Sequence, residues 1–460
     1  MKGIADPTKA LDRGLVAIRR QYQVPEAFPA EVRAAAEEAA KRPPADHADW
    51  TGRQFVTLDP KQSTDLDQAF TIERSGHDLL LHYAIADVAW FVRDGDPIDL
   101  EAWRRGTTLY LPDGKASLYP HVLSQGAASL LPEGPRPAVV FTVRVDRQGE
   151  VRLDGAVRAI VRSRAKLAYE DVPASDLPDD FVEFARRIEA AEQRRGAARV
   201  DPPEQEVVAL GAGRYELLFR PKLQSEQRNA ALSLAANLAI ADALLAHRTG
   251  LFRVMGAPDK RAIKRLRFTA KALGVDWPGG LSLEDFERRL EPGDPGQASF
   301  MLAVRRAGPP ASYMPYTDGI VPWHAAMAAT YAHATAPLRR LADRYVVQAA
   351  LAVANGRAVP GRVTLAFAKL PAIMSRADAR AGQVERAAID LAETVMLHGQ
   401  EGQIFPAIVT DIDERGARMQ LCKLPVVARV EAKDARAGDE LDVKLISADV
   451  DRRELRFTAA

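Results

Sequence analysis

Cysteine is almost missing from this chain of 460 residues, which contains only Cys422. One cysteine excludes an intramolecular disulfide and a metal site built from several thiolates, and it fits a reducing compartment. Long apolar runs are missing too. The segment 79–92 is interrupted by His82 and Asp87, and it falls short of the roughly 20 residues that a membrane-spanning helix needs. Because the first 20 residues also lack the apolar core of a secretory signal, we expect a cytoplasmic protein without a membrane partner.

An excess of charge is equally missing, since Lys and Arg total 63 and Asp and Glu total 62. A net charge of +1 gives no global argument for nucleic-acid binding, so a local basic surface would have to provide it. One candidate surface is a group of five cations: Lys260, Arg261, Lys264, Arg265 and Arg267. A solvated helix face explains the same pattern equally well.

A chain of this length exceeds one compact core, so we expect several domains. Residues 1–48 predict a small helical unit, with Leu11, Leu15 and Ile18 at helical spacing and a second helix over residues 31–41. The unit has no sequence typical of a β-barrel. It is interpreted either as a packing or linker element or as a helix pair that contacts nucleic acid.

Residues 49–400 mix both kinds of secondary structure. Strand-forming sequence occupies five segments: 55–58, 69–72, 79–86, 139–145 and 156–161. Residues 232–246 and 335–354 are rich in Ala, Leu and Arg and predict helices. No period of 20 to 50 residues repeats, which argues against a solenoid. The expected fold class is therefore multidomain α+β.

The last part of the chain, residues 401–460, predicts a β-barrel. It contains five short strand-like runs: 404–412, 418–422, 426–430, 440–447 and 454–457. Five strands in about 55 residues are typical of an OB fold, a common binder of single-stranded nucleic acid. A small structural barrel without a ligand is the alternative.

The densest chemical signal is the stretch 57–70, TLDPKQSTDLDQAF. We expect Asp59 to close one strand, and Asp65 and Asp67 to open the next with both side chains on one side. Carboxylate oxygens placed together suit Mg²⁺ or Mn²⁺, which support hydrolysis of phosphodiesters. A Ca²⁺ loop or a plain solvated turn would look similar.

Together with several later segments, this stretch closely resembles the catalytic RNB domain of the RNase II and RNase R exoribonucleases. The matching segments keep their order along the chain: 82–89 (HYAIADVA), 105–113 (RGTTLYLPD), 118–120 (LYP), 123–124 (LS), 235–237 (AAN), 251–254 (LFRV), 331–343 (YAHATAPLRRLAD) and 385–386 (ER). The resemblance covers about residues 50 to 395. Residues 403–457 resemble the S1-type OB barrel of the family. Residues 1–48 depart from the cold-shock barrels with which typical members begin, and no Lys-rich extension follows the barrel, which favours RNase II over RNase R.

The resemblance implies that Asp59, Asp65 and Asp67 are the catalytic metal-binding aspartates, with Asp67 the most important. The family usually has a fourth aspartate where this sequence has Gln68. An amide oxygen can also ligate a hard cation, but it is neutral and binds more weakly.

Other residues gain roles from the same resemblance. Arg339 is expected to contact the scissile phosphate, with Arg340 in support, although Arg339 could instead form a structural salt bridge to a nearby aspartate such as Asp343. Tyr110 is expected to stack on the terminal bases; without the resemblance it would be assigned to the core.

Glu385 and Arg386 either hold RNA or brace the site. The resulting hypothesis is a monomeric enzyme that uses Mg²⁺ or Mn²⁺ to remove 5′-monophosphate nucleotides processively from the 3′ end of single-stranded RNA, with no obligate protein partner. The alternatives are a catalytically weakened RNA-binding protein and a phosphodiesterase that acts on a small nucleotide or on DNA.

Overall fold

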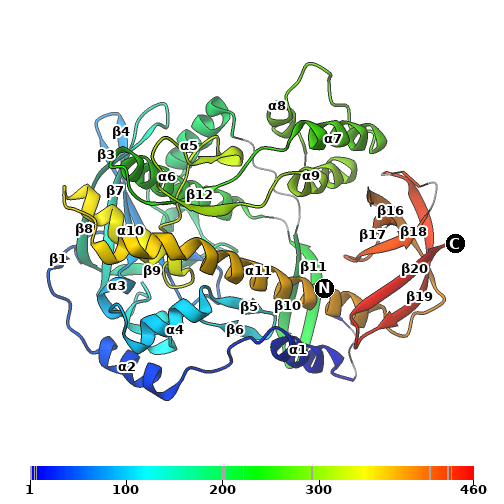
Figure 1. The fold of residues 1–460 in the computed structure, drawn as a ribbon, viewed down its shortest axis with the longest axis horizontal. Coiled ribbons are helices and arrows are strands. Elements are labelled where there is room, and N and C mark those ends of the chain that lie inside the picture. The colour runs from blue at the N-terminus through cyan, green and yellow to red at the C-terminus, as the bar shows by residue number, and fades with distance from the viewer. Residues whose placement is uncertain are drawn as a thin grey trace.

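The fold is known from a computed structural model, which describes the chain except residues 1, 2, 5, 7, 198–203, 221, 292, 293, 414, 415, 433, 434 and 437. The larger body contains a seven-stranded sheet, called the central sheet below, whose strands lie at the left of Figure 1. Its strands are β1 (Ala48–Asp49), β2 (Phe55–Asp59), β3 (Gln68–Ser75), β4 (Asp78–Ala86), β7 (Arg136–Val145), β8 (Val151–Val161) and β9 (Ser163–Ala168).

The strand order in this sheet is β1-β8-β7-β4-β3-β2-β9. The inner neighbours pair antiparallel, whereas β1 runs parallel to β8 and β9 runs parallel to β2. All five strand-forming segments predicted within residues 49–400 lie in this sheet, which confirms the expected α+β class. The central strand β4 is buried at successive positions, so it carries an almost continuous apolar run.

Three helices pack around the sheet and each other: α5 (Phe181–Arg195), α6 (Gln224–Ala246) and α10 (Leu341–Ala354). Helix α6 is long and apolar enough to cross a membrane by length and composition, but 61% of its apolar window is buried inside the protein. Its contacts with β7, β8 and α10 account for that composition. A core helix therefore explains the apolar run of α6.

Helix α10 begins later than predicted. The expected helix over 335–354 starts only at Leu341. Pro337 disfavours a helical conformation at Ala336, and the Ala336 N–H donates to the Asp343 carboxylate at 2.8 Å. Residues 335–340 consequently form a loop, and this loop carries the arginines of the candidate site.

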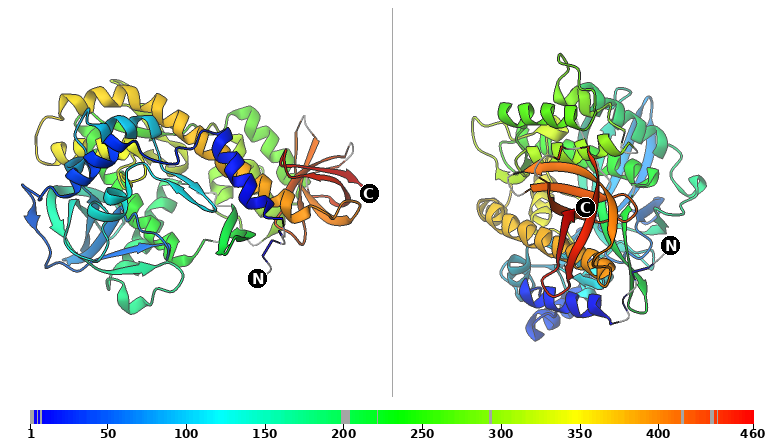
Figure 2. Two further views of the ribbon diagram at one scale, coloured as in Figure 1. Left: turned by 90° about the horizontal axis from the view of Figure 1, so that it is seen from below. Right: turned by 90° about the vertical axis from the view of Figure 1, so that its right-hand side faces the viewer.

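The N-terminal segment forms two helices, α1 (Ala10–Gln21) and α2 (Ala30–Ala40). Helix α1 lies alongside the 37-residue helix α11 (Gly361–Leu397), as the left view of Figure 2 shows. The two helices approach closely at Gly14, where a Cβ atom would lie 2.5 Å from the Leu391 side chain. Helix α2 packs on α4 (Pro97–Arg105). Both helices thus serve as packing elements.

Helix α11 extends over about 55 Å at 1.5 Å per residue. It runs from the region of the central sheet to the C-terminal barrel (Figure 1) and contacts the hairpin of β10 (Glu204–Gly211) and β11 (Arg214–Arg220) on the way. A separate apolar cluster holds together α7 (Lys260–Ala272), α8 (Leu283–Glu287) and α9 (Pro295–Ala307). Trp277, Phe286 and Phe300 contact one another in this three-helix unit.

The C-terminal barrel consists of β16 (Ile404–Asp413), β17 (Gly416–Leu421), β18 (Val427–Glu431), β19 (Glu440–Asp449) and β20 (Glu454–Ala459). It closes in the order β16-β17-β18-β20-β19, which confirms the predicted five-stranded barrel. Shorter elements complete the fold: α3 (Val88–Phe91), β5 (Leu109–Leu111), β6 (Gly114–Ala116), η1 (Leu123–Ala127), η2 (Ala174–Asp176), β12 (Leu251–Val254), β13 (Ser312–Pro315), β14 (Trp323–His324), η3 (Ala325–Met327) and β15 (Ala329–Thr330).

Candidate active site

The three aspartates of the acidic stretch lie on either side of one loop. Asp59 ends β2 as predicted, but Asp65 and Asp67 precede β3 instead of opening it, because β3 begins at Gln68. The backbone of this loop forms hydrogen bonds with Ser129. The Leu66 N–H donates to the Ser129 hydroxyl at 2.9 Å, and that hydroxyl donates to the Thr64 carbonyl at 2.8 Å. Ser129 therefore fixes the loop that presents both carboxylates.

Asp67 is the most enclosed of the three carboxylates, with 3% of its surface exposed. One oxygen accepts a hydrogen bond from the Leu338 N–H at 2.7 Å, and the other accepts one from Arg339 Nε at 3.2 Å. Burial raises the pKa of Asp67 to about 7, against the opposing effect of the Arg339 charge and the Leu338 N–H. The negative charge of nearby Asp65 raises this pKa further.

Asp59 lacks the donors that Asp67 has. Burial raises its pKa to about 6; the Arg339 charge opposes this effect and the Asp65 charge adds to it. No hydrogen bond or ion pair reaches the Asp59 carboxylate from the residues that the structure describes. A buried carboxylate without a donor favours its neutral form, and a cation placed beside it would reverse that preference.

Asp65 faces the hairpin of β5 and β6. Tyr110 and Lys115 are cross-strand partners in this hairpin, so their side chains lie on the same face. Lys115 Nζ lies 2.5 Å from one Asp65 oxygen, and the Tyr110 hydroxyl lies 3.5 Å from the other. The Tyr110 residue remains 54% exposed, so it is not the core tyrosine considered in the absence of the family resemblance.

The Gln68 side chain forms a hydrogen bond with a residue of the neighbouring strand β4. The hydroxyl of the fully buried Tyr83 donates to Gln68 Oε1. This carbonyl oxygen is the atom that would ligate a cation. One of its two lone pairs is therefore occupied, and the role of Gln68 as a metal ligand stays a prediction.

The loop 335–340 directs its two arginines to different carboxylates. Arg339 contacts Asp67, whereas Arg340 donates to both oxygens of Asp343, at 3.0 and 2.8 Å. The alternative of a structural salt bridge between Arg339 and a nearby aspartate fits this geometry, but the partner is Asp67, because Asp343 pairs with Arg340.

The Arg339 carbonyl oxygen is fixed by a neighbouring segment. It accepts hydrogen bonds from the Thr107 hydroxyl at 2.8 Å and the Thr108 N–H at 3.0 Å. Gly106 precedes them with φ +72°, and a Cβ there would lie 2.7 Å from the Ala377 Cβ on α11. Both the backbone conformation and the close approach require glycine at this position.

Glu385 and Arg386 lie further along α11. Arg386 Nε pairs with Asp390 at 2.9 Å, and the charges that act on Glu385 are those of Glu204 and Arg305. Glu385 and Arg386 thus interact with β10, α9 and α11 itself. By contrast, the charges of Arg339 and the aspartates act on the pKa values of Asp59, Asp67 and Tyr110.

The chemistry of the donor set fits a hard divalent cation. Across the described part of the chain, no three Asp, Glu, His or Cys side chains are gathered closely enough to hold a metal ion by themselves. Magnesium is commonly held by one or two carboxylates, with waters and substrate phosphate oxygens as the other ligands. Asp59, without a donor and raised in pKa, and Asp65 beside it provide carboxylates for such an open site.

Comparison with known proteins identifies the family. Residues 47–354 match the RNB domain, and this match spans more than half of the chain. The chain belongs to the RNB family. Residues 403–460 match the RNase II-type exonuclease C-terminal S1 domain, which agrees with the closed barrel. The RNB family comprises exoribonucleases that are divalent-metal-dependent hydrolases.

The relatives of this RNB-family chain are named Ribonuclease R. The protein of Aquifex aeolicus is 26% identical over 96% of this chain and 69% of its own length. That of Escherichia coli is 25% identical over 98% of this chain and 62% of its own length. The chain thus spans about two thirds of the length of these relatives. The expected closer likeness to RNase II is not confirmed.

A solved structure shares the fold. The RNase R of Mycoplasma genitalium, in complex with ribose methylated single-stranded RNA, has a TM-score of 0.86 and 20% sequence identity. The match covers 100% of this chain and 79% of that protein. At this identity the likeness shows the fold alone.

Sequence reasoning missed four residues around the carboxylates: Tyr83, Lys115, Ser129 and Tyr169. Ser129 follows η1, and the hydroxyl of Tyr169 accepts a hydrogen bond from Asn229 at 2.8 Å. The charge of Asp59 acts on Tyr169 and raises its pKa, after burial as the main cause. Only Lys115 had a local signal, since the turn at Pro112-Asp113-Gly114 predicts the hairpin that pairs it with Tyr110.

Proposed function

We propose that this chain is a 3′→5′ exoribonuclease that hydrolyses single-stranded RNA processively to 5′-monophosphate nucleotides. The observation that carries the proposal is the contact of Asp67 with Leu338 and Arg339. This contact joins the acidic stretch to the arginine loop across about 270 residues of an RNB domain. It combines carboxylates for a cation with a guanidinium for a phosphate.

The cofactor in this proposal is Mg²⁺ or Mn²⁺, held by Asp59, Asp65 and Asp67. When bound, the ion would lower the pKa of a water molecule and stabilise negative charge on the phosphate. Gln68 is a weaker ligand in this scheme, because its amide oxygen is neutral and already accepts a hydrogen bond from the Tyr83 hydroxyl. Lys115 neutralises Asp65 while no divalent ion is present.

The remaining residues position the RNA. Arg339 contacts the scissile phosphate, and its Nε bond to Asp67 orients the guanidinium toward the carboxylates. Arg340 supports this loop through its pair with Asp343. The exposed ring of Tyr110 stacks on a terminal base, an interaction that any base can make.

Glu385 and Arg386 contact a part of the RNA that lies farther from the carboxylates and nearer to the barrel. We divide the chain into a helical unit (1–48), the catalytic domain (49–400) and an RNA-binding barrel (401–460). A monomer without an obligate protein partner and a cytoplasmic location complete the proposal. The single cysteine is consistent with that location.

The test is incubation of 5′-labelled single-stranded RNA with the purified chain, with and without Mg²⁺ or Mn²⁺. A metal-dependent ladder of 3′-shortened products is expected, and Asp67→Asn should abolish it while RNA binding persists. A matched single-stranded DNA should remain intact.

The alternative is a catalytically weakened RNA-binding protein, suggested by glutamine at position 68. It is not favoured, because Asp59, Asp65, Asp67 and Arg339 are all present and interact. Intact RNA under every metal condition, with retained binding, would support that alternative and refute the hydrolytic proposal.

A further inference from the structure

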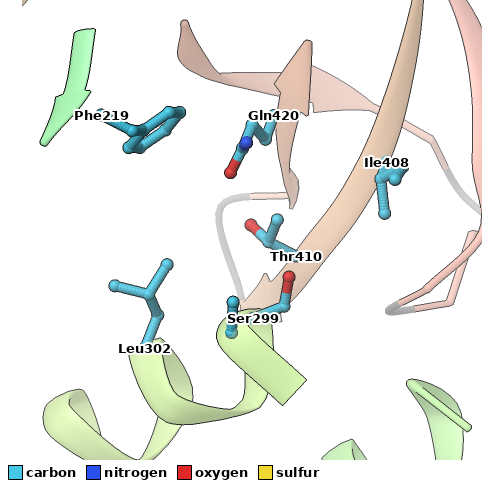
Figure 3. A pocket seen from close by; sticks show the side chains of 7 residues that line it. Phe219, Ser299, Leu302, Ile408, Thr410 and Gln420 are labelled. Atoms are coloured by element: carbon cyan, nitrogen blue, oxygen red, sulfur yellow. The ribbon is translucent and has the colours of Figure 1, made fainter. Parts of the chain in front are cut away.

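A small open pocket lies where three parts of the chain meet: the hairpin strand β11, helix α9 and the barrel strands β16 and β17. Its cavity volume is about 70 Å³. Figure 3 shows Phe219, Leu302, Thr410 and Gln420 around one common space. None of these residues belongs to the site around the aspartates.

The barrel strands present their outer face to this pocket. Val409 and Met419 are cross-strand partners that point into the barrel core, where both are fully buried. Because side chains alternate along a strand, their neighbours Ile408 and Gln420, which also pair across the strands, point outward. The pocket is therefore built on the exterior of the barrel.

The pocket walls combine one aromatic ring with two polar groups. The Phe219 ring is half-buried, and it makes no contact with another ring among the described residues. The Gln420 amide forms no hydrogen bond within the part of the chain that the structure describes. The Thr410 hydroxyl makes only a long bond, 3.4 Å, to the Arg418 carbonyl oxygen, so its lone pairs can still accept.

We propose that this pocket binds one nucleobase of the RNA strand whose 3′ end lies at the aspartates, an inference that rests on the proposed function. A base is a flat heteroaromatic ring with donors and acceptors on its edge. Phe219 stacks on the face of the base, Leu302 and Ile408 provide apolar contact, and the Gln420 amide pairs with its edge. Rings and amides in this combination are typical of single-strand recognition.

Charge on the adjoining helix favours a nucleic acid over an apolar peptide. Helix α7 contains six cations and no acidic residue over Lys260–Ala272. Five of them are exposed and form no ion pair among the described residues: Lys260, Arg261, Lys264, Arg265 and Lys271. These cations can attract the phosphates that flank a bound base.

Helix α7 is close enough to the pocket for that role. Leu266 and Ala270 of α7 pack in one apolar cluster with Phe300 of α9, and packed helices lie about 8 to 10 Å apart. The barrel also reaches α7, since a Cβ on Gly438 would lie 2.8 Å from the Ala272 carbonyl oxygen. The cationic helix thus packs against both α9 and the barrel, the two elements that contribute to the pocket.

The experiment is an abasic scan on the full chain with Asp67→Asn, which prevents hydrolysis during binding. Single-stranded RNAs of one length carry a single abasic nucleotide at successive positions, and their dissociation constants are measured. Apart from the terminal nucleotides near Tyr110, one upstream position at a fixed distance from the 3′ end should weaken binding roughly 5- to 100-fold.

Replacing Phe219 by leucine keeps apolar volume and removes the ring. Phe219→Leu should weaken binding of intact RNA by the same factor and remove the effect of the upstream abasic position, whereas Phe219→Trp should restore both. Leu210→Ala, an exposed apolar position on the same hairpin, is the matched control and should leave the scan unchanged.

Gln420→Leu provides an independent readout. It should equalise the affinities for the four bases at that upstream position without abolishing the abasic effect there. A scan without an upstream step, or a step that persists unchanged in Phe219→Leu, would overturn the proposal. Hydrolysis by the wild-type chain is measured separately, so failure of the nuclease function and failure of the pocket give different results.

Discussion

At the scale of single residues, the contact between Asp67 and Arg339 sets the orientation of two side chains of the candidate site. The guanidinium lies against a buried carboxylate, and its Nε donates to one carboxylate oxygen, which restricts the orientation of both side chains. A side chain fixed in this way needs little reorganisation when charge develops on a phosphate.

Replacing Arg339 by lysine should keep the positive charge but remove the planar set of donors. We expect single-turnover hydrolysis to slow by about 10² to 10³-fold, the typical effect of removing one transition-state donor, while RNA affinity changes little. Arg186→Lys on α5, whose side chain is 66% exposed, is the control. An unchanged rate would mean that Arg339 does not contact the reacting phosphate.

Gln68 offers a gain-of-function test. Gln68→Asp adds a carboxylate next to Asp67, so the concentration of Mn²⁺ that gives half-maximal hydrolysis should fall by about tenfold, or 1.4 kcal/mol of ion binding. Calorimetric titration of the RNA-free chain should show the same direction. Gln62→Asp places the same charge on the exposed part of this loop and should have little effect. Equal behaviour of both variants would remove position 68 from the metal site.

Residue spacing revealed only part of this site. Asp59, Asp65, Asp67 and Arg339 stood out because their motifs resemble those of a known family, and the structure brings them together. Ser129 and Tyr83 could not be found in this way. A serine that fixes a loop and a tyrosine that bonds an amide have no local pattern, since their partners lie 65 and 15 residues away and meet only in the folded chain.

At the scale of elements, strands were easier to predict than the ends of helices. The five strands of the barrel and five strands of the central sheet follow from apolar and β-branched runs, which tertiary packing reinforces. The start of α10 was missed, because Ala336-Pro337 and the Asp343 side chain redirect six residues into a loop. The amino-acid composition of a segment does not show that a proline and a side-chain hydrogen bond will compete with helix formation.

Helix α11 is joined to the barrel through Glu393, which is 3% exposed. One of its oxygens accepts from the Gln205 amide at 2.6 Å and from the Val427 N–H at 2.7 Å. Burial raises the pKa of Glu393 to about 7. Because the pKa of Glu393 is raised in the folded state, its protonated carboxyl contributes to the free energy of unfolding. This contribution is fully present below the unfolded-state pKa and is lost as the pH rises through about 7.

Glu393→Gln keeps an oxygen acceptor and cannot ionise. We expect this variant to be more stable than the wild type at pH 8, on the order of 2 kcal/mol. The difference should disappear below about pH 4, where the wild-type carboxyl becomes protonated in both the folded and the unfolded state. Chemical denaturation across this range is the measurement. Glu189→Gln, a solvent-facing position on α5, should show no such trend. Equal stability at pH 8 would show that the buried charge is compensated.

At the scale of the whole molecule, nucleic-acid affinity has to arise from the distribution of charge, since the net charge is only +1. Replacing Lys260, Lys264 and Arg265 by glutamine should lower the slope of log Kd against log salt for single-stranded RNA by about 2, at roughly 0.7 for each phosphate that these cations no longer neutralise.

The control for this charge test is Arg152→Gln, Arg186→Gln and Arg248→Gln, three exposed arginines elsewhere. Both triple variants change the net charge from +1 to −2, as 1 − 3 = −2. Equal slopes in both would mean that α7 is the solvated helix face allowed by the sequence.

Helix α11 has a consequence for length measurement. It is one continuous helix of 37 residues that packs against α10 at one end and against β19 and β20 at the other. In the proposed enzyme this helix, which contains Pro371, keeps the span between the aspartates and the barrel roughly constant. We then expect a single RNA length at which the 5′ end no longer reaches the barrel. At that length the residence time on the enzyme should drop in one step instead of declining gradually.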